Sequence, residues 1–339
     1  MRRTQTRKSI NIKDKEDLIY FQLRQNKFYQ QRLPAWRPVP TLCSIILFYF
    51  IFSLIFIGIG ILFIIFSKKI KEIEIKYNEE CKRQKENCDE PNGECTCKIE
   101  LDITKDMDSP IFIYYKLYGF FQNNRLYMKS KSLDQLMGKE TDLSKMKSAE
   151  DCDPIYTNGD MGFSGNNLAA DQSSTLVKDD LAIPCGIMAK TYFNDNFTEW
   201  KINEEDKPLD INEKNIAWEK DKKLFKNTDL SKQWIDIEDE HFIVWMRPAG
   251  LPDFRKLWGR IENKDLKKGD KLKITIENNY DVDKYGGDKS IILSTSNVFG
   301  GDNTFLGICF VAVGGISLLL GFGFIISNFI QKKGKVKEK

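Results

Sequence analysis

Two long uncharged stretches dominate the pattern of hydrophobic and polar positions. Residues 42–66 and 305–330 contain no charged side chain, and each is long enough as a helix to cross a hydrocarbon core about 30 Å thick. A signal peptide has a shorter apolar core of about 7–15 residues, and a helix in a soluble core rarely runs so far without polar residues. The mean hydropathy of the chain is nevertheless −0.42, so most of its mass lies in water. We therefore predict two transmembrane helices.

The two predicted spans divide the chain into five parts. They are an N-terminal tail, a first span, a large central segment, a second span and a C-terminal tail, at residues 1–41, 42–66, 67–304, 305–330 and 331–339. The first tail carries a net charge of +7 and the last a net charge of +4, whereas the central segment carries −8. Because basic segments stay on the cytosolic side of a membrane, we expect both tails in the cytosol and the central segment outside it.

The central segment alternates between aromatic, β-branched runs and turn-forming residues, which is typical of strands. We expect strands at residues 111–121, 241–246, 271–280 and 290–296. Short helices are expected at 132–139 and at 251–261, where Pro252 would lie in the first turn and Gly259 near the end. The pattern predicts a β-rich ectodomain with a few helices.

Six of the eight cysteines lie in the central segment, whereas Cys43 and Cys309 lie in the spans. The six are Cys81, Cys88, Cys95, Cys97, Cys152 and Cys185. An even number in an extracytosolic segment favours disulfides. A zinc cluster of the first four is the alternative, but their spacing lacks paired Cys-x-x-Cys knuckles. The spacing alone leaves the pairing open.

The sequence offers little from which to build a catalytic site. The chain has one histidine, His241, and neither a phosphate-binding Gly-rich loop nor a Gly-x-Ser-x-Gly elbow. Neither span carries an ionisable residue, so the protein alone cannot form an ion path through the bilayer. We therefore expect no catalytic residues, no metal, no cofactor and no nucleic-acid partner. An ecto-enzyme remains an alternative that turnover by the ectodomain would support.

Three features indicate interaction or modification. The segment 26–40 places aromatic residues among basic and amide groups before the first span and ends in three prolines, which favour an extended chain. The second span carries Gly307, Gly314 and Gly321 seven residues apart, so one helix face is small enough for another helix to approach closely. Asn196 begins the Asn-Phe-Thr acceptor of N-glycosylation.

Six segments in chain order resemble one known family. They are FYQQRLPAWRPVP (28–40), NNRLYMKSKSLDQLMG (123–138), IPCGIMAKTYFNDNF (183–197), IAWEKDKKLFKN (216–227), HFIVWMRPAGLPDFRKLWGRI (241–261) and NNYDVDKYGGDKSIILSTSNVFGGDNTFLG (278–307). With the two spans in place, they resemble the cell-division-control-protein-50 or ligand-effect-modulator family, the non-catalytic β subunits of P-type ATPases that flip phospholipids. The resemblance covers nearly the whole chain after residue 25.

The resemblance implies a fold and a disulfide pairing. The ectodomain would be an antiparallel β-sandwich with helical additions. Its disulfides would join Cys81 to Cys97, Cys88 to Cys95, and Cys152 to Cys185. The family often carries a glycan in an Asn-Asp-Thr version of the segment at Asn194, where this chain reads Asn-Asp-Asn and the acceptor has moved to Asn196.

The implied function is to bind a lipid-flipping ATPase, stabilise it, escort it out of the endoplasmic reticulum and support its transport cycle. The expected addresses are the endoplasmic reticulum, Golgi, endosomes and plasma membrane, with membrane lipids around the spans. The partner-binding residues would be Phe28, Gln31, Leu33, Trp36 and Pro38 on the cytosolic side, and Gly307, Gly314 and Gly321 in the membrane. A free-standing surface receptor or adhesion glycoprotein is the alternative.

Overall fold

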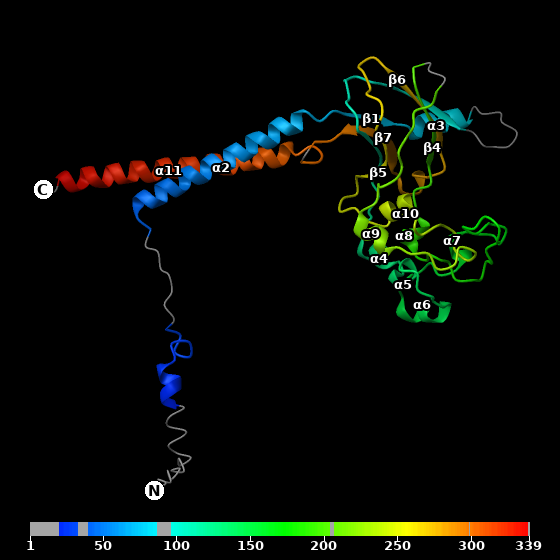
Figure 1. Ribbon diagram of the computed structural model, residues 1–339, viewed down its shortest axis with the longest axis horizontal. Coiled ribbons are helices and arrows are strands. Elements are labelled where there is room, and N and C mark those ends of the chain that lie inside the picture. Colours follow the sequence, from blue (N-terminus) through cyan, green and yellow to red (C-terminus); the bar gives the residue numbers. More distant parts are fainter. Residues whose placement is uncertain (1–19, 33–39, 87–95, 204–206, 298, 338–339) are drawn as a thin grey trace, which may run out of the picture. The chain divides into compact units, whose positions relative to one another are not determined.

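The computed structural model describes residues 20–32, 40–86, 96–203, 207–297 and 299–337 (Figure 1). The chain forms two compact units, residues 60–309 and residues 1–59 with 310–339. Its strands are β1 (Glu72–Lys76), β2 (Cys97–Asp102), β3 (Ile111–Tyr118), β4 (Asn196–Ile202), β5 (Phe254–Ile261), β6 (Lys271–Glu277) and β7 (Asp288–Thr295). Its helices are α2 (Leu42–Lys68), α3 (Asn78–Glu86), α4 (Arg125–Lys129), α5 (Leu133–Leu136), α6 (Leu143–Ala149), α7 (Asn158–Met161), α8 (Ile187–Lys190), α9 (Glu219–Leu224), α10 (Glu240–Trp245), the 3₁₀ turn η1 (Asp283–Tyr285) and α11 (Thr304–Lys337).

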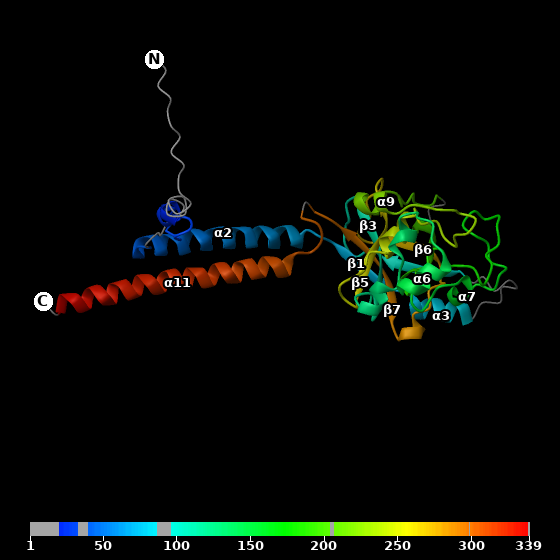
Figure 2. The same ribbon diagram turned by 90° about the horizontal axis from the view of Figure 1, so that it is seen from below.

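The helices α2 and α11 confirm the two predicted spans, and both are long and apolar enough to cross a membrane. Each begins at a polar side chain that accepts a hydrogen bond from the first turn. The hydroxyl of Thr41 accepts from the amide of Ser44, and the carboxylate of Asp302 accepts from the amide and hydroxyl of Thr304. Two views at right angles show α2 and α11 side by side (Figures 1 and 2).

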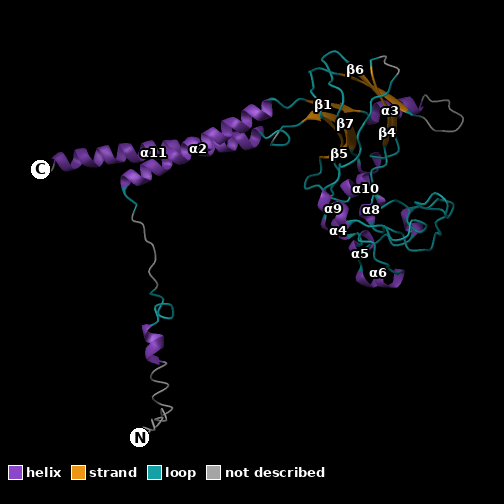
Figure 3. Ribbon diagram, in the orientation of Figure 1, coloured by secondary structure: helices purple, strands orange, loops and turns teal. Residues whose placement is uncertain are grey.

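The seven strands in the described part of the ectodomain pair in antiparallel fashion and form two sheets. The four-stranded sheet has the order β1-β7-β3-β5, and the three-stranded sheet has the order β2-β6-β4. Burial alternates along β2 and β3, so one face of each sheet is turned inward. Figure 3 shows the strands gathered in one part of the ectodomain and the helices α4 to α10 in another.

The two sheets share one hydrophobic core. Phe197 on β4 meets Trp258 on β5 with ring centroids 4.8 Å apart, and Tyr115 on β3 stacks on Phe193 at 3.9 Å. This confirms the β-rich, antiparallel, disulfide-bonded ectodomain with a few helices.

Helix α10 (Glu240–Trp245) covers residues 241–245, so the strand predicted at 241–246 is wrong. The carboxylate of Asp239 accepts hydrogen bonds from the amides of His241 and Phe242 and caps the N-terminus of α10. Phe242, Ile243 and Trp245 are then buried on one side of a helix rather than alternating. The local preference of β-branched and aromatic residues for strands is overridden by this cap and by the core.

Residues 254–261 are strand β5, so the helix predicted at 251–261 is also wrong. Phe254 and Trp258 are buried, and they flank a buried Lys256 while Arg255 is exposed, as the period of a strand requires. The pairing with β3 decides this. A Cβ on Gly259 would lie 2.8 Å from Ile211, so this glycine allows the loop at 211–212 to approach rather than ending a helix.

Candidate functional site

The segment before the first span contains exposed aromatic side chains in the part that the structure describes. Residues 20–25 are helical, and the turn that follows places Gln31 at a positive φ of 52°. Phe28 is 67% exposed and contacts Tyr29, with ring centroids 5.9 Å apart. Large exposed apolar side chains of this kind indicate a surface that another molecule or the membrane covers. Leu33, Trp36 and Pro38 lie outside the described residues.

The three glycines of the second span face the first span of the same chain. A Cβ on Gly307 would lie 2.8 Å from Ile64, and one on Gly314 would lie 2.7 Å from Ile57 and 3.1 Å from the carbonyl oxygen of Ser53. Gly321 lies beside Tyr49 and Phe50 at ordinary contact distance. The close approach expected of this face is therefore made within the chain. A contact of these three glycines with a partner stays a prediction.

Two other glycines of α11 lie on an open side of the helix. A Cβ on Gly315 or Gly323 would meet nothing within 4 Å, so a second helix has room there at small cost. The sequence could not distinguish these glycines from their neighbours, because seven-residue spacing identifies a face and not what covers it.

Hydrogen bonds tie the ectodomain ends of both spans to the first and last strands. Lys71 and Thr295 exchange two hydrogen bonds of 2.9 and 3.0 Å. The amide of Asn297 donates to the carbonyl of Phe66 at 2.9 Å, which satisfies an end carbonyl of α2. The amide N–H of Asn303 donates to the hydroxyl of Ser67 at 2.8 Å. The ectodomain is thus anchored to both helix ends within residues 60–309.

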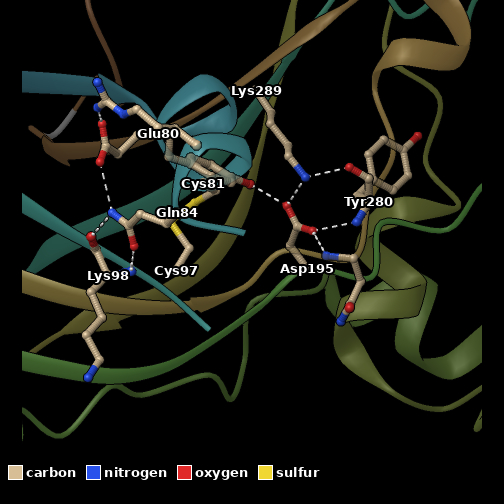
Figure 4. Close-up of a disulfide and its surroundings, with 11 residues drawn as sticks. Glu80, Cys81, Gln84, Cys97, Lys98, Asp195, Tyr280 and Lys289 are labelled. Carbon is tan, nitrogen blue, oxygen red and sulfur yellow. Dashed lines mark hydrogen bonds and ion pairs between the residues drawn. A yellow bond between two sulfur atoms is a disulfide. The ribbon is translucent and has the colours of Figure 1, made fainter. Parts of the chain in front are cut away.

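The first disulfide holds α3 against β2 (Figure 4). Cys81 and Cys97 are bonded, with Cα atoms 5.0 Å apart, as the resemblance implies. The side-chain amide of Gln84 donates to the carbonyl of Lys98 and accepts from its N–H, both at 2.8 Å. Gln84 therefore makes the two backbone hydrogen bonds that a neighbouring strand would make with Lys98. Cys88 and Cys95 lie outside the described residues, so their pairing stays a prediction.

The second disulfide holds together the helical part of the ectodomain. Cys152 and Cys185 are bonded, again as implied, and both are fully buried. They form a small separate core with Met146, Met161 and Ala182. Because this cluster is small, the covalent bond has a large share in its stability. The described residues thus contain two disulfides. A zinc site built from the first four cysteines would need Cys81 and Cys97 as free thiolates, and they are bonded to each other instead.

A buried carboxylate fixes the backbone next to the glycosylation acceptor. Asp195 Oδ2 accepts from the hydroxyl of Tyr77 and from Lys289 Nζ, both at 2.6 Å. Its Oδ1 accepts from the amides of Asn279 and Tyr280 at 2.7 and 2.6 Å. Figure 4 shows these bonds converging on one side chain. The next residue, Asn196, begins β4, is exposed and donates a 3.3 Å hydrogen bond to Glu277.

Sequence reasoning missed Asp195 and Lys289 as partners, since they lie 94 positions apart. The only signal was that both belong to segments that carry the family resemblance. Burial lowers the pKa of Lys289, while Asp195 opposes this effect. Burial and the Asp195 carboxylate raise the pKa of Tyr77 well above its usual value. The three groups thus form a structural network that is closed to solvent.

The part of the chain that the structure describes holds no group of three or more side chains suited to bind a metal ion. His241, the sole histidine, contacts Glu213 at 3.2 Å and packs on Trp258 at 4.1 Å. It therefore lies in a structural contact between α10 and a loop.

Comparison with known proteins extends the resemblance over most of the chain. The family model described as LEM3 (ligand-effect modulator 3) family / CDC50 family matches residues 63–334. ALA-interacting subunit 3 of Arabidopsis thaliana is 33% identical over 331 residues, which cover 91% of this chain and 87% of that protein. Cell cycle control protein 50A of Mus musculus is 35% identical over 340 residues, covering 89% and 87%. The match includes the end of the first span, the whole ectodomain and the second span, and the chain therefore belongs to the LEM3/CDC50 family.

Proposed function

We propose that this protein is the accessory β subunit of a P-type ATPase that moves phospholipids across a membrane. The observation that carries the proposal is the family match over residues 63–334, which includes the ectodomain and the second span. The relatives include proteins named as ALA-interacting subunits, which are subunits by name rather than enzymes. ATP hydrolysis and the phosphorylated aspartate would belong to the partner.

The architecture supports contacts with a partner in three regions: the predicted cytosolic side, the membrane and the extracytosolic side. Exposed aromatic residues such as Phe28 lie before the first span on the predicted cytosolic side. The open side of α11 at Gly315 and Gly323 offers room for a helix in the membrane. The ectodomain, anchored through Asn297 and Asn303 to the span ends, would cover the extracytosolic loops of the partner. Tethered contacts of this kind reinforce one another, because the second and third form at high effective concentration.

The proposal includes a role in the maturation of the ATPase. A partner with many spans would expose polar loops and helix faces that this subunit covers, so pairing would stabilise it and favour exit from the endoplasmic reticulum. The −8 charge of the central segment against basic tails supports cytosolic termini. Glycosylation at Asn196 would fit this topology, since the acceptor lies in the exposed first residue of β4.

Affinity purification of the tagged full chain in mild detergent, followed by mass spectrometry, tests the proposal. We expect a P-type ATPase to copurify in stoichiometric amounts. Depletion of the subunit should remove that ATPase from membranes beyond the endoplasmic reticulum. A chain that reaches the cell surface alone and recovers no ATPase would contradict the proposal and favour a free-standing receptor.

A further inference from the structure

A pocket of ≈310 Å³ opens beside β5, which is the edge strand of the four-stranded sheet. Three parts of the ectodomain line it: β5 itself, the end of α10 with the loop that follows, and the residues that lead into α9. Most of its wall is apolar and comes from residues such as Ile216, Ala217, Ile243 and Pro248. Apolar pockets with a few polar groups are the usual form of a binding site.

The inner wall contains a buried lysine amine. Lys256 is 7% exposed and donates hydrogen bonds to the carbonyls of Val244 and Trp245, both at 2.9 Å, and to that of Arg247. No carboxylate among the described residues pairs with it. Burial, together with the nearby Arg247, lowers the pKa of Lys256 to about 7. Backbone carbonyls and two aromatic rings surround this amine. A carboxylate in the pocket would favour its protonated form and be attracted to it.

The mouth of the pocket consists of an aromatic ring and a guanidinium group. Trp218 is 67% exposed, and the Arg247 guanidinium lies 4.5 Å from its ring centroid. The nearest carboxylate, on Asp221, is 3.7 Å from Arg247 Nε, so Arg247 keeps donors for a further acceptor. Tryptophan and arginine are the residue types that contribute most often to the energetic centres of protein interfaces.

The charge of the pocket is opposite to that of the ectodomain. Arg247, Arg255 and Lys256 line it against a single acidic residue, Asp221, whereas the central segment carries −8. Arg255 is paired with Glu72 at 2.6 Å, which leaves Arg247 and Lys256 to attract an anion. The flanking segments expose Leu224 and Leu251, so the apolar surface continues past the pocket, as at a protein interface.

We propose that this pocket receives an acidic segment from an extracytosolic loop of the partner ATPase, with an apolar side chain in the pocket and a neighbouring carboxylate at Arg247. The inference rests on the proposed function and makes it specific. The apolar wall excludes water around the inserted side chain, which strengthens the attraction between the carboxylate and the two cations. Trp218 covers the inserted side chain at the mouth.

Site-specific photo-crosslinking in the full chain tests this. A photoreactive phenylalanine replaces Trp218, the chain is expressed with the ATPase, and adducts are mapped after irradiation. We expect a crosslink to an extracytosolic ATPase loop within a few residues of an Asp or Glu. A crosslink confined to lipid, or to an ATPase loop without acidic residues, would overturn the inference, as would the absence of any adduct.

Two substitutions give an independent measurement. Trp218→Ala and Arg247→Gln should each lower ATPase recovery by about fivefold or more, since loss of an interface centre commonly exceeds a tenfold change in affinity. Leu168→Ala and Lys268→Gln are matched controls, because both residues are exposed and lie outside the pocket, and they should leave recovery unchanged. Thermal unfolding of each variant verifies that the fold persists.

The outcomes separate the two proposals. If the unaltered chain recovers no ATPase, the proposed function fails. If the unaltered chain recovers the ATPase and all four variants do so equally, the proposed function stands and the pocket is not the docking site.

Discussion

Lys289 Nζ lies 2.6 Å from Asp195 Oδ2, and both side chains have an exposed fraction of 0%. The pair connects β7 to the residue before β4, and through Tyr77 it reaches the segment after β1. Since the two sheets meet here, the pair joins them at a point where an unpaired charge would be costly.

We predict that Asp195→Asn destabilises the ectodomain by about 3–5 kcal/mol, because it leaves the Lys289 ammonium buried without its counter-ion. Urea unfolding of the purified full chain, followed by tryptophan fluorescence, measures this. The surface pair of Lys76 and Asp288, at 2.8 Å, is the control, and Lys76→Met should cost less than about 1 kcal/mol. Equal effects of the two substitutions would contradict a special role for the buried pair.

Adjacent glycines of α11 should differ in their response to a larger side chain. Gly314→Leu would place atoms against Ile57 and Ser53 and should separate α2 from α11. Gly315→Leu meets open space in the chain alone. We expect Gly314→Leu to lower the thermal midpoint of the isolated protein in detergent, and Gly315→Leu to leave it unchanged.

The same pair of variants tests where a partner helix docks. If the open side of α11 is used, Gly315→Leu lowers ATPase recovery although the isolated protein stays stable. Full recovery with Gly315→Leu would mean that this side faces lipid.

The disulfide between Cys152 and Cys185 should contribute strongly to the stability of the helical part of the ectodomain. Replacing both cysteines with serine is expected to cost about 2–5 kcal/mol, since the cluster around them contains few other buried residues. Non-reducing peptide mapping should recover the links Cys152–Cys185 and Cys81–Cys97. A link from Cys152 to Cys81 would exclude this arrangement.

Glycosylation at Asn196 gives a simple prediction. Treatment with an endoglycosidase should lower the apparent mass of the protein, and Asn196→Gln or Thr198→Ala should abolish the shift because each removes the acceptor motif. Thr198→Ser keeps the motif and should keep the shift. A shift that persists in Asn196→Gln would place the glycan elsewhere.

Stability should depend little on pH between 5 and 6, which is below the lowered pKa of the buried Lys256. Hydrogen bonds from the backbone and hydroxyls of Ser174 and Ser173 hold the pKa of Asp171 well below its usual value, and those from Ser144 and Lys145 lower that of Asp142 to about 2. A carboxylate with a lowered pKa stabilises the fold above its ordinary pKa and loses this effect as the pH falls. Thermal midpoints measured from pH 6 to 3 should therefore decline only below about pH 4.

Some features were open to prediction because they depend on composition or on local signals. The two spans follow from 25 or more consecutive uncharged residues, and no tertiary contact is needed to make such a segment partition into lipid. The strands at 111–118, 271–277 and 288–295 follow from β-branched and aromatic residues between turn formers. The two described disulfides agree with the family resemblance and not with any rule of spacing.

Other features required the fold itself. Local signals predict a strand at residues 241–246 and a helix at 251–261, whereas the Asp239 cap and the pairing with β3 make the first a helix and the second a strand. The glycine face of α11 is recognisable in the sequence, whereas its contact with α2 is a fact of packing. The two spans and the family were thus determined by the sequence, since hydrophobic length and motif order lie along the chain. The partners of Asp195, the buried Lys256 and the pocket beside β5 were decided by tertiary structure, because each joins residues that only folding brings together.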